Sequence, residues 1–322
     1  MGVIFKMDKM TYDVVIIGGG PAGLTAAIYA SRARMKTLLI ESIATPGQAV
    51  TTSDIENYPG FTEGLNGFEL IERFKKQAEN FGTEFKTGDV KGVEGRKWDD
   101  SIAWRIESER EEFLSLSVII ATGARPKKLD LPGEDRLKGK GVSYCAVCDG
   151  AFFSNKNIAV IGGGDTAVEE ALFLTKFADR VTLVHRRDRL RATKILQERA
   201  FANKKIEVLW DCVASEILGS DKVEALKIKN LKDGRESDLS CEGVFVFIGY
   251  TPNTSFLKGI VKLDEWGYVI TDHDMKTSRD GIFACGDARK KLLRQIVTAC
   301  GDGATAAFSA EGYVEHLKAG RV

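Results

Sequence analysis

Continuous apolar runs mark the strands that this chain is expected to bury. Residues 14–17 read Val-Val-Ile-Ile inside a strand predicted over 12–17, and further strands are predicted over 37–40 and 117–121. Unbroken apolar runs are typical of parallel strands that helices cover on both faces. A helix is predicted over 24–34, so the N-terminal region is expected to form a strand–helix–strand unit.

The same pattern returns in the middle of the chain. A strand is predicted over 157–161, a helix up to residue 177 and a second strand over 181–184. Gly18 precedes Glu41 by 23 residues, and Gly162 precedes His185 by the same 23. The chain is therefore predicted to hold two copies of one α/β unit, each with a parallel sheet.

The remaining pattern places smaller elements around these two units. Residues 67–81 carry apolar side chains at helical spacing, which favours a core-facing stripe, and a last helix is predicted from about 301 to 317. Residues 83–116 indicate a small antiparallel sheet, and 206–248 mixed strands. Residues 124–140 and 249–253 are rich in Gly, Pro and polar residues and are expected to connect two domains.

The loop after the first strand has the glycine spacing of a dinucleotide-binding turn. Its glycines would permit a tight turn, a close approach of a pyrophosphate and close packing of helix on strand. Glu41, at the end of the next strand, is placed to accept hydrogen bonds from a ribose diol. The candidate cofactor-binding residues here are Gly18, Gly20, Pro21, Ala22, Gly23 and Glu41.

The second loop repeats this spacing but changes the residue that would meet the ribose. Its candidates are Gly162, Gly164, Asp165 and Thr166, with Ala167 at the third glycine position. Where the first copy has an acid, the second has His185, Arg186 and Arg187, with Arg191 further on. Arginines pair with a 2′-phosphate and a carboxylate would repel it, so NADPH is expected rather than NADH. The alternative is a solvated basic helix start.

Two cysteines lie between these loops, separated by two residues. A C-x-x-C spacing can lower a thiol pKa, and Asp149 directly after Cys148 could move a proton as general acid or base. The alternatives are half of a zinc site or a structural disulfide. A zinc site requires four ligands, whereas the other four cysteines are scattered along the chain and the sequence has only three histidines. Cys145 and Cys148 are therefore predicted to be a redox-active pair, with no metal.

The chemistry of these sites suggests what the first loop holds. Because the first loop has no residue that would bind a 2′-phosphate, it would bind NAD or FAD. NADPH gives up a hydride, whereas disulfide exchange proceeds through thiolates. A flavin converts one into the other, so FAD is the expected cofactor.

Composition limits the other classes. The chain has 322 residues, with Lys plus Arg and Asp plus Glu at 46 each, so no basic excess favours nucleic acid. No window approaches about 20 apolar residues, so no membrane span is expected. The first ten residues lack the apolar core of a secretory signal, and a cytoplasmic location is expected.

Taken together, the motifs resemble those of bacterial-type, low-molecular-weight thioredoxin reductases. The match covers all but about ten N-terminal residues and rests on residues 18–23, 47–48, 56–60, 145–150, 162–170, 185–191, 286–287 and 294–295. The resemblance implies an α/β fold of two Rossmann-like three-layer domains, the second inserted in the first. An FAD domain would comprise 1–123 and 250–322, and an NADPH domain 124–249. It also implies a homodimer, a thioredoxin-like protein as electron acceptor, and a rotation of the NADPH domain about the two crossings.

The resemblance further implies residue roles. Besides the residues above, it assigns to FAD the set Gly47, Gln48, Asn57, Gly286, Asp287, Arg294 and Gln295. Cys148 would lie beside the flavin, Cys145 would exchange with thioredoxin, and Asp149 would be the acid–base residue. Cys285 departs from the usual pattern and Cys300 precedes Gly301; both are expected to be buried small hydrophobes.

Three other functions fit parts of the pattern. They are a flavin-dependent dithiol oxidase, an NADPH–ferredoxin oxidoreductase, and a nicotinamide-sensing module with the cysteines as a redox switch. The cysteine pair disfavours the second, and the arginines disfavour an oxidase that needs no nicotinamide.

Overall fold

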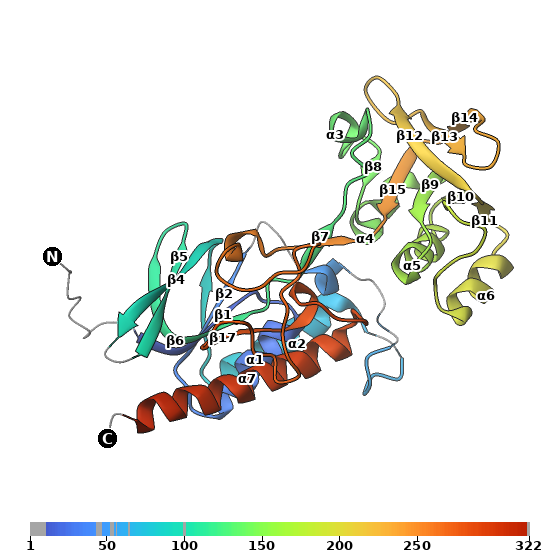
Figure 1. Cartoon of the computed structure of the whole chain (residues 1–322). Coiled ribbons are helices and arrows are strands. Elements are labelled where there is room, and N and C mark those ends of the chain that lie inside the picture. Colours follow the sequence, from blue (N-terminus) through green and yellow to red (C-terminus); the bar gives the residue numbers. More distant parts are fainter. Residues whose placement is uncertain are drawn as a thin grey trace. The chain divides into compact units, whose positions relative to one another are not determined.

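The chain divides into two compact units. The computed structural model describes residues 11–42, 47–51, 55, 57–63, 65–98 and 101–320. Unit 1 comprises residues 1–125 and 251–322, and unit 2 comprises residues 126–250 (Figure 1). Unit 2 is thus an insertion in unit 1. The sequence-based expectation about the first ten residues lies outside the described part.

Unit 1 is built on one mixed sheet with the strand order β3-β2-β1-β6-β5-β4, and β17 pairs with β6. The strands are β1 (Thr11–Ile17), β2 (Thr37–Glu41), β3 (Glu84–Thr87), β4 (Val90–Trp98), β5 (Ser101–Ser108), β6 (Glu112–Ile120) and β17 (Ile282–Ala284). Pairing is parallel among β3, β2, β1, β6 and β17, with Ile16 opposite both Leu39 and Ile119. It is antiparallel among β4, β5 and β6.

The antiparallel strands expected over 83–116 therefore do not form a sheet of their own. β3 joins the parallel sheet, and β6 runs unbroken from Glu112 to Ile120. Its outer half pairs with β5, and its inner half pairs with β1 and β17. The charges at 107–112 concealed this continuity, because they lie at the solvent-exposed turn where β5 meets β6.

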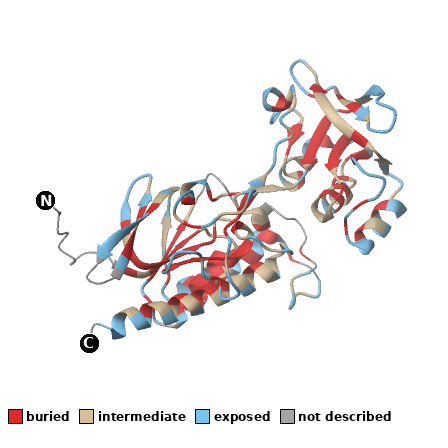
Figure 2. Cartoon of the chain, viewed as in Figure 1, coloured by how far each residue is buried: buried red, intermediate tan, exposed pale blue. Residues whose placement is uncertain are grey.

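The sheet of unit 1 is covered on both faces, as its unbroken apolar runs predict. Val14 and Ile16 pack into one core with α1 (Pro21–Arg32), α2 (Gly67–Asn80) and α7 (Ile296–Ala319). Val15 and Ile17 point into a second core on the other face. Figure 2 shows the buried residues concentrated along the sheet and the inner sides of these helices. Because every second residue serves a different core, neither face can be polar.

Helix α7 is longer than expected and packs closely on α1. It begins at Ile296, where Gln295 and Thr298 form a capping box. A Cβ at Gly303 would collide with the carbonyl oxygen of Ala22 in α1, so the approach of the two backbones requires glycine.

Replacing Gly303 with Ala is therefore expected to destabilise unit 1. The added methyl group has no free volume, and overpacking of this kind costs about 1–3 kcal/mol. Denaturant unfolding measures the loss. Gly301, whose Cβ would meet nothing within 4 Å, provides the matched control, and an equal effect of Gly301→Ala would contradict the explanation.

Unit 2 has a parallel sheet with the strand order β11-β10-β9-β15-β8. The strands are β8 (Val142–Ser143), β9 (Asn157–Gly162), β10 (Arg180–Val184), β11 (Ile206–Leu209) and β15 (Gly243–Phe247). Helices α4 (Ala146–Asp149), α5 (Asp165–Leu174) and α6 (Lys194–Ala202) accompany this sheet. The antiparallel strands β12 (Cys212–Leu218), β13 (Ala225–Asn230) and β14 (Glu236–Ser240) form a second sheet, and α3 spans Glu134–Leu137. One core lies between the helices and the parallel sheet, the other between the two sheets.

The chain crosses between the units through two short paired strands. These are β7 (Ala124–Pro126) and β16 (Tyr250–Pro252). Beside them, the Thr122 hydroxyl donates to the Asn253 carbonyl at 2.8 Å, and Asn253 Nδ2 donates to the Thr122 carbonyl at 3.0 Å. Both units contain a parallel sheet with helices, so the predicted α/β class with two Rossmann-like units is confirmed.

Candidate active site

The first glycine-rich loop joins β1 to α1 in a conformation that its glycines permit. Gly18 has φ +119°, and a Cβ there would collide with the Ala121 carbonyl group. A Cβ at Gly23 would collide with the Gly18 carbonyl oxygen. Gly20 is the N-cap of α1 with no side-chain capping bond, and a Cβ there would meet nothing within 4 Å. Pro21 and Ala22 follow in the first turn, so the loop presents uncapped helix N–H groups to open space.

Glu41 lies over this loop at the carboxyl end of β2. One of its carboxylate oxygens accepts a hydrogen bond from Lys75 Nζ at 2.6 Å. The other lies so close to Gly19 that a Cβ there would be 2.6 Å from it. The carboxylate is thus held beside the glycine turn, as expected for binding of a ribose. Lys75 was not predicted, because nothing in its sequence neighbourhood distinguishes it from other helix-surface lysines.

A second group of unit 1 candidates follows β17. Asp287 lies in η4 (Gly286–Ala288), directly after the Gly286 turn at φ +65°. Burial raises the pKa of Asp287, with Lys291 and Arg294 opposing the shift, and its Oδ1 has no hydrogen-bond partner among the described residues. Arg294 stacks over the Tyr268 ring at 4.3 Å, and its buried Nε likewise has no partner there. Such orphaned polar atoms fit a site that a polar ligand completes.

The polar loops of unit 1 contribute three further candidates. Gln48 Nε2 in η1 (Gln48–Thr51), which follows Gly47, donates to the Ala124 carbonyl at 2.9 Å. Asn57 Nδ2 donates to Gln295 Oε1 at 3.0 Å, which joins the 56–60 motif to the start of α7. Glu56 and residues 45–46, which belong to the same motifs, lie outside the described residues.

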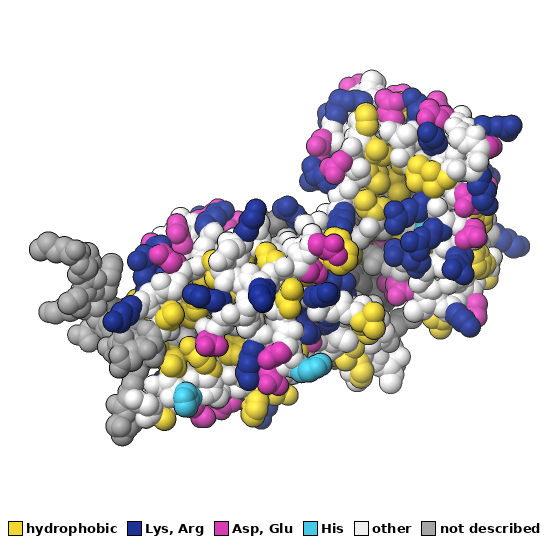
Figure 3. Space-filling view, viewed as in Figure 1, with side chains coloured by type: hydrophobic (Ala, Val, Ile, Leu, Met, Phe, Trp, Pro, Cys, Tyr) yellow, Lys and Arg dark blue, Asp and Glu magenta, His cyan; other side chains and the backbone are white. Residues whose placement is uncertain are grey.

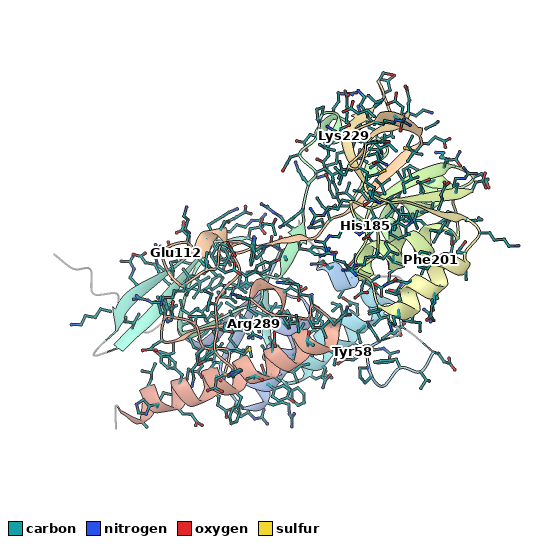
Figure 4. All side chains as sticks on the ribbon, turned by 45° about the vertical axis from the view of Figure 1, so that its right-hand side comes forward. Tyr58, Glu112, His185, Phe201, Lys229 and Arg289 are labelled. Carbon is teal, nitrogen blue, oxygen red and sulfur yellow. A yellow bond between two sulfur atoms is a disulfide. The ribbon has the colours of Figure 1, made fainter. Side chains whose placement is uncertain are left out.

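Sequence reasoning missed an ion-pair cluster that fixes the loop after β17. Asp302 in α7 accepts bonds from Arg289 at 3.2 Å, Lys291 at 2.7 Å and the Gly286 backbone N–H at 3.1 Å. All three charged side chains are largely buried (Figure 4 labels Arg289). The cluster holds the segment that carries Asp287 and Arg294 against α7. In the sequence, only the arginine and the two lysines shortly before Arg294 indicated an ion-pair cluster.

The second glycine-rich loop joins β9 to α5 in unit 2. Gly162 has φ +156°, and Gly164 is the N-cap of α5, again without a side-chain cap. Asp165 Oδ1 accepts the Thr193 backbone N–H at 2.6 Å, and the Arg191 N–H donates to the Gly163 carbonyl at 2.7 Å. The loop is therefore attached to the segment that carries the predicted arginines. Thr166 follows in the first turn of α5.

His185 and the arginines take different positions at this loop. His185 is buried, its Nε2 lies 3.0 Å from the Arg189 carbonyl, and a Cβ at Gly163 would collide with its ring (Figure 4). Burial lowers the pKa of His185, so the imidazole is neutral at pH 7. Arg186, Arg187 and Arg191 are exposed. The His185 ring thus packs against the backbone of the glycine-rich loop. The three arginines are exposed and can bind an anion.

The cysteine pair forms a disulfide at the start of α4. Cys145 and Cys148 are bonded with their Cα atoms 5.4 Å apart, and Cys148 is exposed whereas Cys145 is half-buried. Cys145 is the N-cap, and its Sγ accepts the Cys148 backbone N–H at 3.1 Å. A donor at this distance would stabilise a Cys145 thiolate once the disulfide is reduced. Asp149 is half-buried in the same turn.

The chain is similar to known proteins over nearly its whole length. The family model described as pyridine nucleotide-disulphide oxidoreductase matches residues 12–303. Thioredoxin reductase of Listeria innocua is 47% identical over 313 residues, covering 97% of this chain and 96% of its own. That of Peptoclostridium acidaminophilum is 50% identical over 310 residues, covering 94% and 97%. The crystal structure of Lactococcus lactis thioredoxin reductase matches with TM-score 0.91 and 49% identity, over 95% of this chain and 99% of that one.

The chain belongs to the thioredoxin reductase family. The resemblance stated from the motifs is therefore confirmed, and so is the enzyme class, an NADPH-dependent flavoprotein disulfide oxidoreductase. FAD and NADPH are the cofactors of this family. The orphaned Asp287 and Arg294 atoms and the uncapped starts of α1 and α5 fit two such polar, phosphate-bearing ligands.

The remaining thiols of this family member are not arranged for redox chemistry or metal binding. Cys212, Cys241 and Cys285 are buried, and burial raises the pKa of Cys241 to about 12 and that of Cys285 as well. Cys300 is only half-buried, not buried as expected, and the Tyr58 hydroxyl lies 3.9 Å from its Sγ. Within the described residues, no three His, Cys, Asp or Glu side chains could share a metal ion.

Among the described helices, none combines the length and the apolar character that crossing a bilayer requires. Basic and acidic side chains are interspersed over the visible face of both units in Figure 3, in keeping with the balanced charge of the sequence.

Proposed function

We propose that the chain reduces the disulfide of a thioredoxin-like protein with electrons from NADPH. The observation that carries this proposal is the Cys145–Cys148 disulfide, with residue Cys148 exposed, in the unit that also bears the exposed arginines. The relatives that the chain matches over nearly its whole length are thioredoxin reductases.

Each unit is proposed to hold one cofactor. Unit 1 would hold FAD through the β1–α1 loop, Glu41, Gln48, Asn57 and the Asp287–Gln295 segment, as its orphaned polar atoms support. Unit 2 would hold NADPH through the β9–α5 loop, with Arg186, Arg187 and Arg191 on the 2′-phosphate. When bound, these cofactors supply two electrons, taken from NADPH as a hydride, to reduce the Cys145–Cys148 disulfide.

The cysteines then carry out two successive exchanges. The Cys145 thiolate attacks one sulfur of the acceptor disulfide; the acceptor S–S bond breaks, a mixed disulfide forms, and the second acceptor sulfur leaves as a thiolate. The Cys148 thiolate attacks Cys145 Sγ, which restores the internal disulfide and releases the first acceptor sulfur. Both leaving thiolates take up a proton, so the acceptor gains two electrons and two protons.

Two features of the chain support these roles. The Cys148 N–H that Cys145 Sγ accepts favours the thiolate needed for the first attack. Asp149 follows Cys148 in the same turn and is proposed to supply or accept the proton of a leaving thiol. We further propose that the enzyme works as a homodimer in the cytoplasm, as the family resemblance implies.

The proposed function is tested with purified protein reconstituted with FAD. NADPH should bleach the flavin absorption, and added oxidised thioredoxin should restore it with consumption of one NADPH per disulfide. Oxygen uptake driven by an added dithiol in the absence of NADPH would instead identify a dithiol oxidase. A protein that binds no FAD would contradict the proposal altogether. Light scattering tests the dimer, which should have twice the mass of the chain.

A further inference from the structure

A buried carboxylate accepts a hydrogen bond from the residue that precedes the cysteine pair and is not part of the chemistry proposed above. Glu134, the first residue of α3, is only 2% exposed. Its Oε1 accepts the Leu129 backbone N–H at 2.8 Å and the Tyr144 hydroxyl at 2.6 Å. Its Oε2 accepts the Asp130 N–H at 2.6 Å and the Leu131 N–H at 3.4 Å. Four donors thus converge on one carboxylate.

This carboxylate connects two segments of unit 2. Leu129, Asp130 and Leu131 lie shortly after the first crossing, where the Lys127 N–H donates to the Gly249 carbonyl of the second crossing at 2.9 Å. Tyr144, at the other end of the connection, directly precedes Cys145. Glu134 therefore ties the segment that leaves the crossing to the residue next to the redox pair.

The backbone around Cys145 is held from two sides. Ser143 is buried, and its hydroxyl group lies 3.1 Å from both the backbone N and the carbonyl O of Cys145. The side chain of Tyr144 reaches Glu134 instead, and its ring is covered by Lys138 Nζ at 5.9 Å. The side chains of Ser143 and Tyr144 thus fix the backbone position of Cys145. This position determines where Cys145 Sγ accepts the hydrogen bond from the Cys148 N–H.

General stability alone gives a poor account of this arrangement. A buried carboxylate is costly to desolvate, and apolar residues of similar volume often stabilise a protein as well or better. Here the carboxylate also holds Asp130 at φ +57°, a conformation that non-glycine residues rarely adopt. Buried polar networks whose members are all hydrogen-bonded make the surrounding structure rigid and define its position.

We propose that Glu134 and Tyr144 are positioning residues for the Cys145–Cys148 couple, which they keep in the geometry that favours closure of the disulfide. This inference rests on the proposed exchange at this pair. A well-positioned pair has a high effective concentration of one thiol at the other, and this concentration sets the equilibrium with external thiols. Without the Tyr144–Glu134 bond, Cys145 is less confined, and the internal disulfide is less favoured.

The test is the equilibrium of the cysteine pair with reduced and oxidised glutathione, read by alkylation and mass spectrometry in the FAD-loaded protein. Tyr144→Phe removes only the hydroxyl. We expect its equilibrium to shift about tenfold toward the dithiol, which is about 30 mV for a two-electron couple. Glu134→Gln, which keeps the size of the side chain, should shift it in the same direction. The rate of the initial hydride transfer from NADPH to the flavin, measured by stopped-flow absorption, should stay within about twofold in both variants, because this step precedes electron transfer to the pair.

Unit 1 contains a matched control. The Tyr12 hydroxyl donates to Glu84 at 2.9 Å, so Tyr12→Phe breaks the same kind of bond far from the cysteines in sequence and in the other unit. Its glutathione equilibrium should equal that of the wild type. If Tyr144→Phe and Glu134→Gln also stayed within twofold of the wild type, or if Tyr12→Phe shifted equally, the positioning role would be wrong. The readout requires no thioredoxin, so it is independent of whether thioredoxin is the acceptor.

Discussion

Replacing Cys148 with Ser is expected to abolish disulfide reductase turnover, by about a thousandfold or more, while FAD binding is retained. Without Cys148 no internal disulfide can form, so neither electron transfer to the pair nor release of the mixed disulfide is possible. The hydroxyl group is nearly isosteric with the thiol and lies in an exposed turn, so the fold should survive. NADPH oxidation with thioredoxin measures turnover, and flavin absorption after gel filtration measures FAD content.

The two cysteines are expected to differ in a trapping experiment. In Cys148→Ser the remaining Cys145 should form a stable mixed disulfide with a thioredoxin that lacks its resolving cysteine and whose other cysteine carries a thionitrobenzoate group, which the Cys145 thiolate displaces as thionitrobenzoate anion. Cys145→Ser should form little of this adduct. The structure makes the comparison informative, because Cys148 is the more exposed residue whereas Cys145 Sγ accepts the stabilising N–H. The opposite outcome would exchange the roles of the two sulfurs, and retained turnover in either variant would refute the proposed relay.

Replacing Arg186 and Arg187 together with Ala is expected to raise the KM for NADPH about a hundredfold and to leave the KM for NADH within about threefold. Hydrogen bonds to a charged group contribute about 1.5–3 kcal/mol each, and 2.8 kcal/mol corresponds to a hundredfold change in affinity. Both side chains are exposed, so their loss should not disturb the core of unit 2. Steady-state kinetics with each nucleotide measures the two constants.

Arg189 provides the control for this experiment. It is equally exposed and lies in the same turn, but its backbone carbonyl, not its side chain, contacts His185. Arg189→Ala should change neither constant by more than about threefold if the effect depends on position rather than on total charge. If the double variant impaired NADPH and NADH equally, the arginines would not read the 2′-phosphate.

Sequence reasoning predicted the units because the local patterns there agree with the tertiary packing. The apolar run of β1 serves two cores at once, and the glycines at positions 18 and 23 are required by contacts within a few residues or with one neighbouring strand. A role for the arginine cluster could be hypothesised from spacing alone. The cluster follows His185, which lies as far after Gly162 as Glu41 lies after Gly18. These features depend on short stretches of chain.

The features that were missed depend on side-chain contacts that no periodic sequence pattern marks. Lys75 meets Glu41 across 34 residues, and the Tyr144 hydroxyl meets a glutamate ten residues away that three backbone N–H groups also bind. The continuity of β6 was hidden because its pairing partners change halfway along the strand. No local periodicity encodes such contacts, since they arise only when the sheet and the helices assemble.

The pairing of β7 with β16 has a consequence for how this architecture can change. Because the chain leaves unit 1 and returns to it through neighbouring strands, the whole of unit 2 is attached at one place. The inserted unit can therefore be exchanged for another, or removed, by cutting and rejoining the polypeptide where its two ends already meet. An enzyme built in this way can acquire a new electron donor without any redesign of the sheet that remains.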